Sequence, residues 1–273
     1  MRKVIILLLL CLPDLSVPAQ QNAVPRVSTA SSHVKILDSA FYMPQLNRFR
    51  RIWVYVPAQY PKGGRYPVLY MHDGQNLFDD TSSYAGEWGV DEFLDSTRLR
   101  NCIVVGIDNG REYRMNEYNP FDHGRFGKGE GDAYVDFIVK TLKPAIDRNF
   151  KTARNRSHTF IAGSSMGGLI SFHAILKYPR VFGGAGVFSP AFWTAPGIFD
   201  IIKIKGKKIR GRVFFYAGQQ EGETMVPYTL KAFEMLTAVS KAKISTVIRN
   251  EGKHNEARWR AEFPEFYDWI MKK

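Results

Sequence analysis

The chain has 273 residues, of which 45% are hydrophobic, 14% aromatic and 23% charged, a composition typical of a globular rather than a disordered protein. The length suits one large α/β domain or two small domains. The formal net charge is +12, but the basic residues are scattered, and only the segment 202–210 is densely basic. No helix-turn-helix, zinc-finger or RNP pattern accompanies it, which argues against a nucleic-acid-binding protein and favours a solvated cationic face.

The N-terminal segment has the pattern of a secretory signal peptide. Arg2 and Lys3 precede an apolar run over Val4–Leu12, and Ala19 supplies the small residue expected before a cleavage site. We therefore expect residues 1–19 to be removed and the protein to be exported to the periplasm or the extracellular space. A membrane anchor is the alternative, but the apolar run is much shorter than the ~20 residues that span a bilayer, so no stable membrane insertion is expected.

The remaining chain is interpreted as one domain behind a short leader. Residues 20–34 are polar and are predicted to be a flexible leader, and no linker interrupts residues 35–273. Cleavage would remove Cys11 and leave Cys102 as a single cysteine, which excludes an intramolecular disulfide. Cys102 lies in an apolar run, where we expect a packed thiol.

The domain alternates between strand patterns and helix patterns. Residues 40–60 have alternating apolar positions and predict an antiparallel strand pair. Short Val/Ile/Phe runs follow, which are typical of strands covered on both faces. Segments 132–147, 167–179, 226–242 and 255–271 predict helices. We therefore expect an α/β fold with a mostly parallel sheet and helices on both faces. The strand runs end in polar residues or glycine, which predicts a ligand site at the carboxyl edge of the sheet.

The segment "IAGSSMGG" (161–168) places two serines where a predicted strand turns into a predicted helix. A sharp strand-to-helix bend tolerates only small residues two positions before and after the central residue. Ser165 has Gly163 and Gly167 at these positions, whereas Ser164 has an alanine and a bulky methionine. Ser165 is therefore the candidate nucleophile of a G-x-S-x-G motif, and the helix that it opens can stabilise an oxyanion.

A nucleophilic serine needs a histidine base, which follows the nucleophile and the acid in this type of chain order. Only His173 and His254 lie beyond Ser165. His173 lies two turns into the helix that Ser165 opens, where a packing or surface role is expected. His254 follows a strand pattern and precedes a helix, so we predict that it lies at the carboxyl edge and acts as the general base. The other histidines, His33, His72, His123 and His158, precede Ser165.

The acid that orients the base must lie between these two residues in the sequence. The strand pattern "RVFFYAGQQEGE" ends at the predicted edge and offers Glu221 and Glu223. Glu221 is closer to the strand end and is the favoured acid, while Glu223 remains open. Asp200 and Glu234 fall in helical patterns, and Glu251 is only three residues before His254.

An oxyanion needs a second hydrogen-bond donor besides the helix start. The segment "HDGQNLFD" (72–79) follows an earlier strand, and Gly74 allows a close backbone approach. We therefore predict an oxyanion hole formed by the backbone N–H groups of Gln75 and Met166. Metal binding by His72 and Asp73 is the alternative, but two such residues without partners make a weak ligand set, so neither a metal nor another cofactor is expected.

Two further segments are candidate substrate contacts. Phe192 and Trp193 follow a strand run and could stack on a sugar or an aromatic acyl group, although core packing is an equal alternative. The long cationic segment 109–132 is a candidate substrate loop. Its Arg111, Arg114 and Arg125 could bind an acidic or phenolic group, but solvated arginines are the favoured interpretation.

Seven motifs occur in an order that resembles one family. They are "YMHDGQNLFD", "GEWGVDEFL", "VVGIDNG" with "REYRMNEYNP", "GSSMGGLISF", "FSPAFW", "YAGQQEGETMV" and "GKHNEARW". Over residues 35–271 the chain resembles the putative esterase family (esterase D-like), which includes enterochelin esterases, feruloyl and acetyl-xylan esterases, and mycolyltransferases. The resemblance implies an α/β-hydrolase fold without a large cap domain and no metal. It also implies a catalytic triad at Ser165, Glu221 and His254, although several members have aspartate at the acid position.

The resemblance and the expected export together predict a serine carboxylic-ester hydrolase. Its substrate would be a small-molecule or polysaccharide ester, namely an acyl, feruloyl or acetyl ester of carbohydrate or a siderophore ester. Acyl transfer to a sugar hydroxyl is one alternative, because the same triad would serve. A non-catalytic carbohydrate-binding module on the same fold is another, against which the complete triad argues. The sequence does not indicate an oligomeric state.

Overall fold

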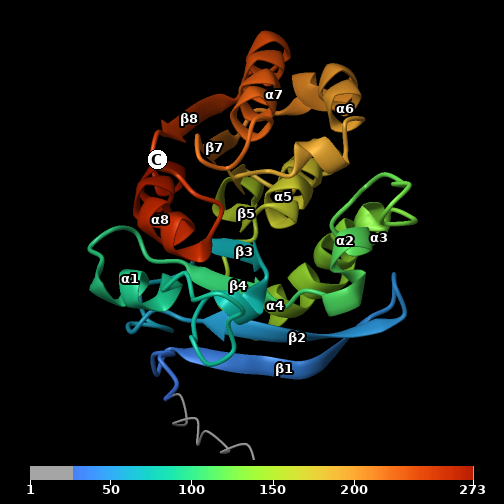
Figure 1. Cartoon of the computed structure of the whole chain (residues 1–273). Helices are drawn as coiled ribbons and strands as arrows, with labels where there is room; N and C mark the ends of the chain where they lie inside the picture. Colours follow the sequence, from blue (N-terminus) through green and yellow to red (C-terminus); the bar gives the residue numbers. More distant parts are fainter. Residues whose placement is uncertain (1–26, 273) are drawn as a thin grey trace, which may run out of the picture.

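The computed structural model describes residues 27–272, so the predicted signal peptide at residues 1–19 lies outside the described residues. One sheet of eight strands organises the described chain (Figure 1), in the order β1-β2-β4-β3-β5-β6-β7-β8. The strands are β1 (Val34–Met43), β2 (Arg48–Tyr55), β3 (Val68–His72), β4 (Ile103–Ile107), β5 (Thr159–Ser164), β6 (Gly184–Phe188), β7 (Arg212–Gly218) and β8 (Lys243–Arg249).

Most neighbouring strands run parallel. β1 pairs with β2 and β2 with β4 in antiparallel register, whereas every pair from β4 through β3 and β5 to β8 is parallel. The predicted antiparallel pair and the predicted mostly parallel sheet are both confirmed. Because the carboxyl ends of parallel strands meet at one edge, the loops after β3 to β8 gather there.

Helices connect the strands. They are α1 (Val90–Ser96), α2 (Arg114–Glu117), α3 (Gly131–Phe137), α4 (Lys143–Asn149), α5 (Met166–Lys177), α6 (Ile198–Lys205), α7 (Met225–Val239) and α8 (Glu256–Met271). A π-helical turn over Ile138–Leu142 joins α3 to α4, so the predicted helix over 132–147 is one continuous element. The other three predicted helices correspond to α5, α7 and α8.

Two hydrophobic cores form on opposite faces of the sheet because successive strand side chains point to opposite faces. In β3, Tyr70 belongs to the core beneath α3 to α7, whereas Leu69 and Met71 belong to the core beneath α1 and α8. The second core is rich in aromatic rings, and Phe266 of α8 packs against Phe188 at a centroid distance of 5.3 Å. Helices therefore cover both faces, as the α/β prediction requires (Figure 1).

The described part of the predicted leader is hydrogen-bonded to the domain. Ser28 Oγ donates to Asp79 Oδ2 at 2.7 Å, and Thr29 Oγ1 accepts from the N–H of Asp80 at 2.8 Å. The N–H of Ser31 donates to Asp91 Oδ2, also at 2.7 Å. These polar groups therefore satisfy carboxylates and a backbone donor of the domain.

Two expectations concern the remainder of the described chain. Cys102 is fully buried, as predicted for a packed thiol, and burial raises the pKa of its thiol to about 12. Residues 27–272 contain no helix that is both long and apolar enough to cross a bilayer.

Candidate active site

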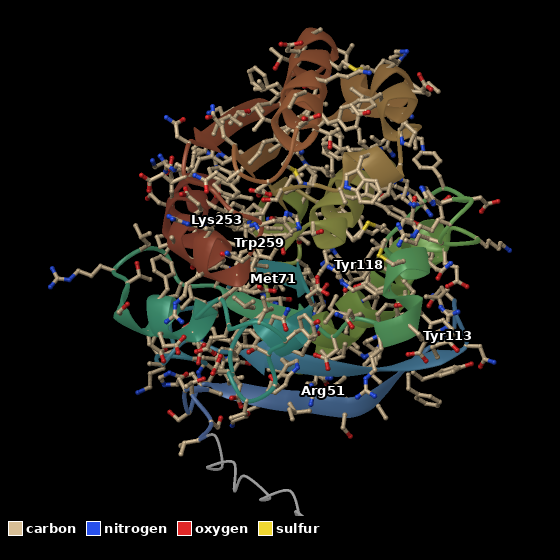
Figure 2. The ribbon with its side chains drawn as sticks, in the orientation of Figure 1. Arg51, Met71, Tyr113, Tyr118, Lys253 and Trp259 are labelled. Atoms are coloured by element: carbon tan, nitrogen blue, oxygen red, sulfur yellow. The ribbon has the colours of Figure 1, made fainter. Side chains whose placement is uncertain are left out.

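A cavity of about 780 Å³ opens at the carboxyl edge of the sheet. Its wall includes Gln75 after β3, Ser165 after β5, and His254 with Trp259 from the segment after β8. Segments far apart in the sequence thus contribute to one wall. Figure 2 shows Trp259 of α8 above Met71 of β3 in the middle of the molecule, with Tyr118, which follows α2, to their right.

Ser165 occupies a strained bend between β5 and α5. Its backbone has φ 57° and ψ −121°, a conformation that residues other than glycine rarely adopt. A Cβ added at Gly163 would come within 2.9 Å of the Gly167 backbone, so the two flanking glycines are in close contact. The N–H of Ser165 donates to the carbonyl of Phe188 at 2.9 Å, which fixes the bend against β6. The half-buried serine lies in the cavity wall, as does Ser164.

Glu221 and His254 form a hydrogen-bonded pair. His254 Nδ1 lies 2.7 Å from Glu221 Oε2, and the carboxylate is fully buried while the imidazole is partly exposed. Glu221 Oε1 accepts a second bond from the N–H of Gly218 at 2.7 Å. Glu223 is exposed. The geometry therefore joins Glu221, and not the alternative Glu223, to the histidine.

Two residues that the sequence reasoning did not identify support this carboxylate. Ser189 Oγ donates to Glu221 Oε1 at 2.9 Å, and Trp259 Nε1 donates to Ser189 Oγ, also at 2.9 Å. The Trp259 ring also packs edge-on against His254, with centroids 5.0 Å apart. The only available sequence signal was position, because Ser189 directly follows the β6 run and Trp259 lies five residues after His254. The chain Trp259–Ser189–Glu221 orients the carboxylate toward the imidazole.

The predicted oxyanion residues lie on two facing segments. Asp73 adopts a left-handed conformation with φ 55°, and a short 3₁₀ turn over Gly74–Asn76 follows it. A Cβ at Gly74 would come within 2.8 Å of the backbone of Gly106 in β4, so only glycine fits. Gln75 lies in the cavity wall, and Met166 is the first residue of α5, where a backbone N–H has no partner within the helix.

A buried ion pair supports this turn. Arg114 Nε and Nη2 donate to the two carboxylate oxygens of Asp73 at 2.7 and 2.9 Å, and Asn109 Nδ2 donates to Asp73 Oδ1 at 2.7 Å. Burial opposes ionisation of Asp73, but the Arg114 guanidinium outweighs it and lowers the pKa of the carboxyl. Burial lowers the pKa of the neighbouring His72 to about 3, so this imidazole is neutral. Arg114 is therefore a structural partner of Asp73 rather than a solvated arginine.

Of the two alternatives for Phe192, the structure shows core packing and not a substrate contact. Phe192 is fully buried and packs against Phe172 and Phe199, with centroids 5.5 and 5.9 Å apart, because the turn after β6 directs it into the core. Trp193 is 48% exposed and lies edge-on to Phe126, but it is not part of the cavity wall. Of the arginines in 109–132, Arg111 and Arg114 line the cavity, whereas Arg125 lies over the Phe126 ring.

The remaining histidines lie apart from this arrangement. His173 is buried in α5 and its Nε2 lies 2.9 Å from Asp132 Oδ1. His33 contacts Asp95, His123 stacks on Phe126, and His158 contacts Asn155. Within residues 27–272, no three His, Cys, Asp or Glu side chains are grouped so that they could hold a metal ion.

The strand order and the position of Ser165 together define the class of fold. A mostly parallel sheet in the order 1-2-4-3-5-6-7-8, with a serine at the bend after β5, has the α/β-hydrolase fold. The structure resembles the BES protein of Bacillus cereus with a TM-score of 0.76 at 21% identity, covering 92% of this chain and 99% of that one. It also resembles the siderophore hydrolase EstB of Aspergillus nidulans with a TM-score of 0.71 at 17% identity, covering 90% and 97%.

The family follows from the sequence match. The model of the family described as putative esterase matches residues 44–270, and the chain belongs to this family. It is 32% identical to the uncharacterized protein YbbA of Bacillus subtilis, over 82% of this chain and 93% of that protein. It is 24% identical to the iron(III) salmochelin esterase of Escherichia coli, over 77% of this chain and 52% of that protein. Membership of this family makes the chain a carboxylic ester hydrolase.

The ion pair between Arg114 and Asp73 gives a testable expectation. Replacing Arg114 with glutamine leaves the Asp73 carboxylate buried without its cation, so the free energy of unfolding should fall by about 3 kcal/mol. The double variant Arg114→Gln with Asp73→Asn removes both charges and should be more stable than the single variant. Urea unfolding of the three proteins measures this difference. Equal stability of the single variant and the unmodified protein would contradict the structural role of the pair.

Proposed function

We propose that this esterase acts through Ser165 as nucleophile, His254 as general base and Glu221 as the acid that orients the base. The observation that carries the proposal is that Ser165 projects from a strained bend into the same cavity wall as an imidazole bonded to a buried carboxylate. A histidine that is only a solvated surface residue would have no need of a buried carboxylate as its hydrogen-bond partner. The hydrogen bonds from Ser189 Oγ and the Gly218 N–H keep the charge of Glu221 directed at Nδ1 of His254.

In the proposed mechanism, Nε2 of His254 takes the hydroxyl proton as Ser165 Oγ attacks the ester carbonyl. Glu221 stabilises the imidazolium that forms, and the N–H groups of Met166 and Gln75 bind the oxyanion. His254 returns the proton to the leaving alcohol, and an acyl-enzyme remains. Water, deprotonated by the same imidazole, then attacks the acyl carbon and releases the acid and the free serine.

One arginine in the cavity wall, Arg111, is placed to contact an ester with an acidic or phenolic group. Arg51 and Arg114 in its wall are paired with Asp108 and Asp73. Arg111 is exposed in the same wall, and among the described residues it forms no ion pair with a carboxylate. Relatives include the salmochelin esterase and an endo-1,4-beta-xylanase/feruloyl esterase of Xylanibacter ruminicola, which is 25% identical over 90% of this chain and 32% of that protein. We therefore propose siderophore or feruloyl esters as substrates.

The triad assignment predicts a specific pattern of losses. Ser165→Ala and His254→Ala should each lower kcat by about 10⁴-fold, because either loss removes the nucleophilic route. Glu221→Gln should lower kcat strongly, whereas the matched variant Glu223→Gln, two residues away in the same loop, should not. Initial rates on a chromogenic ester, with a fluorophosphonate label as a second readout of Ser165, check these expectations. Normal turnover by Ser165→Ala would refute the assignment.

The role of Arg111 can be separated from general charge effects. Arg111→Gln should raise KM for a catecholate or feruloyl ester about tenfold, because a charge-assisted hydrogen bond is lost, while KM for a neutral short-chain ester stays the same. Arg125→Gln removes the same charge from the same loop outside the cavity wall and serves as the control. An equal KM change in both variants would show that Arg111 makes no specific contact.

We further propose that the protein is exported, on the strength of the N-terminal pattern of Arg2, Lys3 and the following apolar run. The mature protein should then begin at Gln20. N-terminal sequencing of the protein recovered from cell fractions identifies its first residue. A protein that still begins at Met1 in every fraction would contradict export.

A further inference from the structure

A second cavity, of about 750 Å³, lies at the opposite edge of the sheet from the active-site cavity. Its wall comes from the segment before β5, from the end of α5 and the turn before β6, and from the segment between α6 and β7. These segments enter the amino ends of three parallel strands, whereas Ser165 and Glu221 follow the carboxyl ends of β5 and β7. The strands of five to seven residues between the two edges are roughly 17–23 Å long.

The wall of this cavity is strongly basic. Lys177 is paired with Asp132 and Asp136. Six further cations of the wall have no ion pair with a carboxylate among the described residues. They are Arg156, Arg180, Lys205, Lys207, Lys208 and Arg210. Among the described residues, no aspartate or glutamate lines the cavity. Cations gathered in a concave surface repel one another, so the arrangement is stabilised by a ligand of high negative charge density.

Exposed apolar side chains lie beside these cations. Ile204 is 67% exposed in the last turn of α6, directly before Lys205 and within one turn of Lys207 and Lys208. Val239 at the end of α7 is 38% exposed and contacts the same segment, because a Cβ at Gly206 would come within 2.6 Å of its Cγ2. Figure 1 shows the ends of α6 and α7 on the outside of the molecule. Basic residues with adjacent exposed aliphatic groups are typical of surfaces that bind anionic lipid headgroups.

We propose that this basic cavity docks the protein onto a phosphate-rich lipid surface, with headgroup phosphates in the cavity and Ile204 at the acyl boundary. The lysines and arginines supply charge-assisted hydrogen bonds to phosphate oxygens. Because the cavity and the proposed nucleophile lie at opposite edges of the sheet, a docked molecule keeps its active-site cavity open to the aqueous phase. The docking site is independent of the triad assignment, since no residue is shared between the two cavity walls.

The test measures sedimentation of the protein with vesicles of phosphatidylcholine, with or without phosphatidylglycerol. The unmodified protein should bind only the anionic vesicles, and salt should weaken the binding. The triple variant Lys205→Gln, Lys207→Gln, Lys208→Gln should bind on the order of 100-fold more weakly, because each lysine near an anionic surface contributes a similar share of the binding free energy. Its hydrolysis of a soluble ester should be unchanged, which shows that it is folded.

Two controls make the result specific. The triple variant Lys35→Gln, Lys62→Gln, Lys151→Gln removes the same charge outside the cavity and should bind like the unmodified protein. Ile204→Ser should weaken vesicle binding but not binding of inorganic tripolyphosphate in solution.

Equal binding by both triple variants would overturn the proposal. Binding of tripolyphosphate or polygalacturonate without binding to anionic vesicles would also overturn it, in favour of a soluble phosphate or an acidic polysaccharide.

Discussion

The close backbone contact between Gly163 and Gly167 is the constraint on which the rest of the site depends. It allows the chain to reverse from β5 into α5 within one residue, and Ser165 takes the strain of that reversal with φ 57°. Strain of this kind costs about 1–3 kcal/mol and persists only where the surroundings determine the conformation. Here the N–H of Ser165 is bonded to Phe188 of β6 and its carbonyl accepts from Leu169 and Ala191. The hydroxyl is therefore presented by a rigid backbone.

A second close contact explains why a glutamate and a histidine 33 residues apart meet. A Cβ at Gly218, the end of β7, would come within 2.3 Å of the Gly252 backbone after β8. The N–H of Gln220 donates to the carbonyl of Gly252 at 3.0 Å. Backbone contacts thus hold the loops that carry Glu221 and His254 against one another. The hydrogen bonds from Ser189 and Gly218 set the direction of the Glu221 carboxylate. Preorganisation of this kind limits the rearrangement that catalysis requires.

Local rules were enough to predict the sheet, its direction and the bend at Ser165, because strand runs, helix periodicity and glycine spacing are properties of short segments. They also placed His254 and Glu221 on the correct edge. Contacts between distant segments were not accessible in this way. The partners of Ser189, Glu221 and Trp259, are 32 and 70 residues away, and Arg114 looked solvated because Asp73 precedes it by 41 residues. Core packing and substrate contact stayed equal alternatives for Phe192, because the sequence of a turn does not reveal which of its aromatic rings points inward.

The two cavities differ in how their charges are balanced. At the carboxyl edge, Arg51 and Arg114 each have an aspartate within 2.7 Å, so their guanidinium groups are held in place. At the amino edge, the segment 202–210 is joined by Arg156 and Arg180 from two other connections. The fold therefore brings basic residues from three separate segments of the chain together on one concave surface. Paired cations suit a site that must hold a geometry, whereas unpaired ones leave an attractive field for an anionic partner.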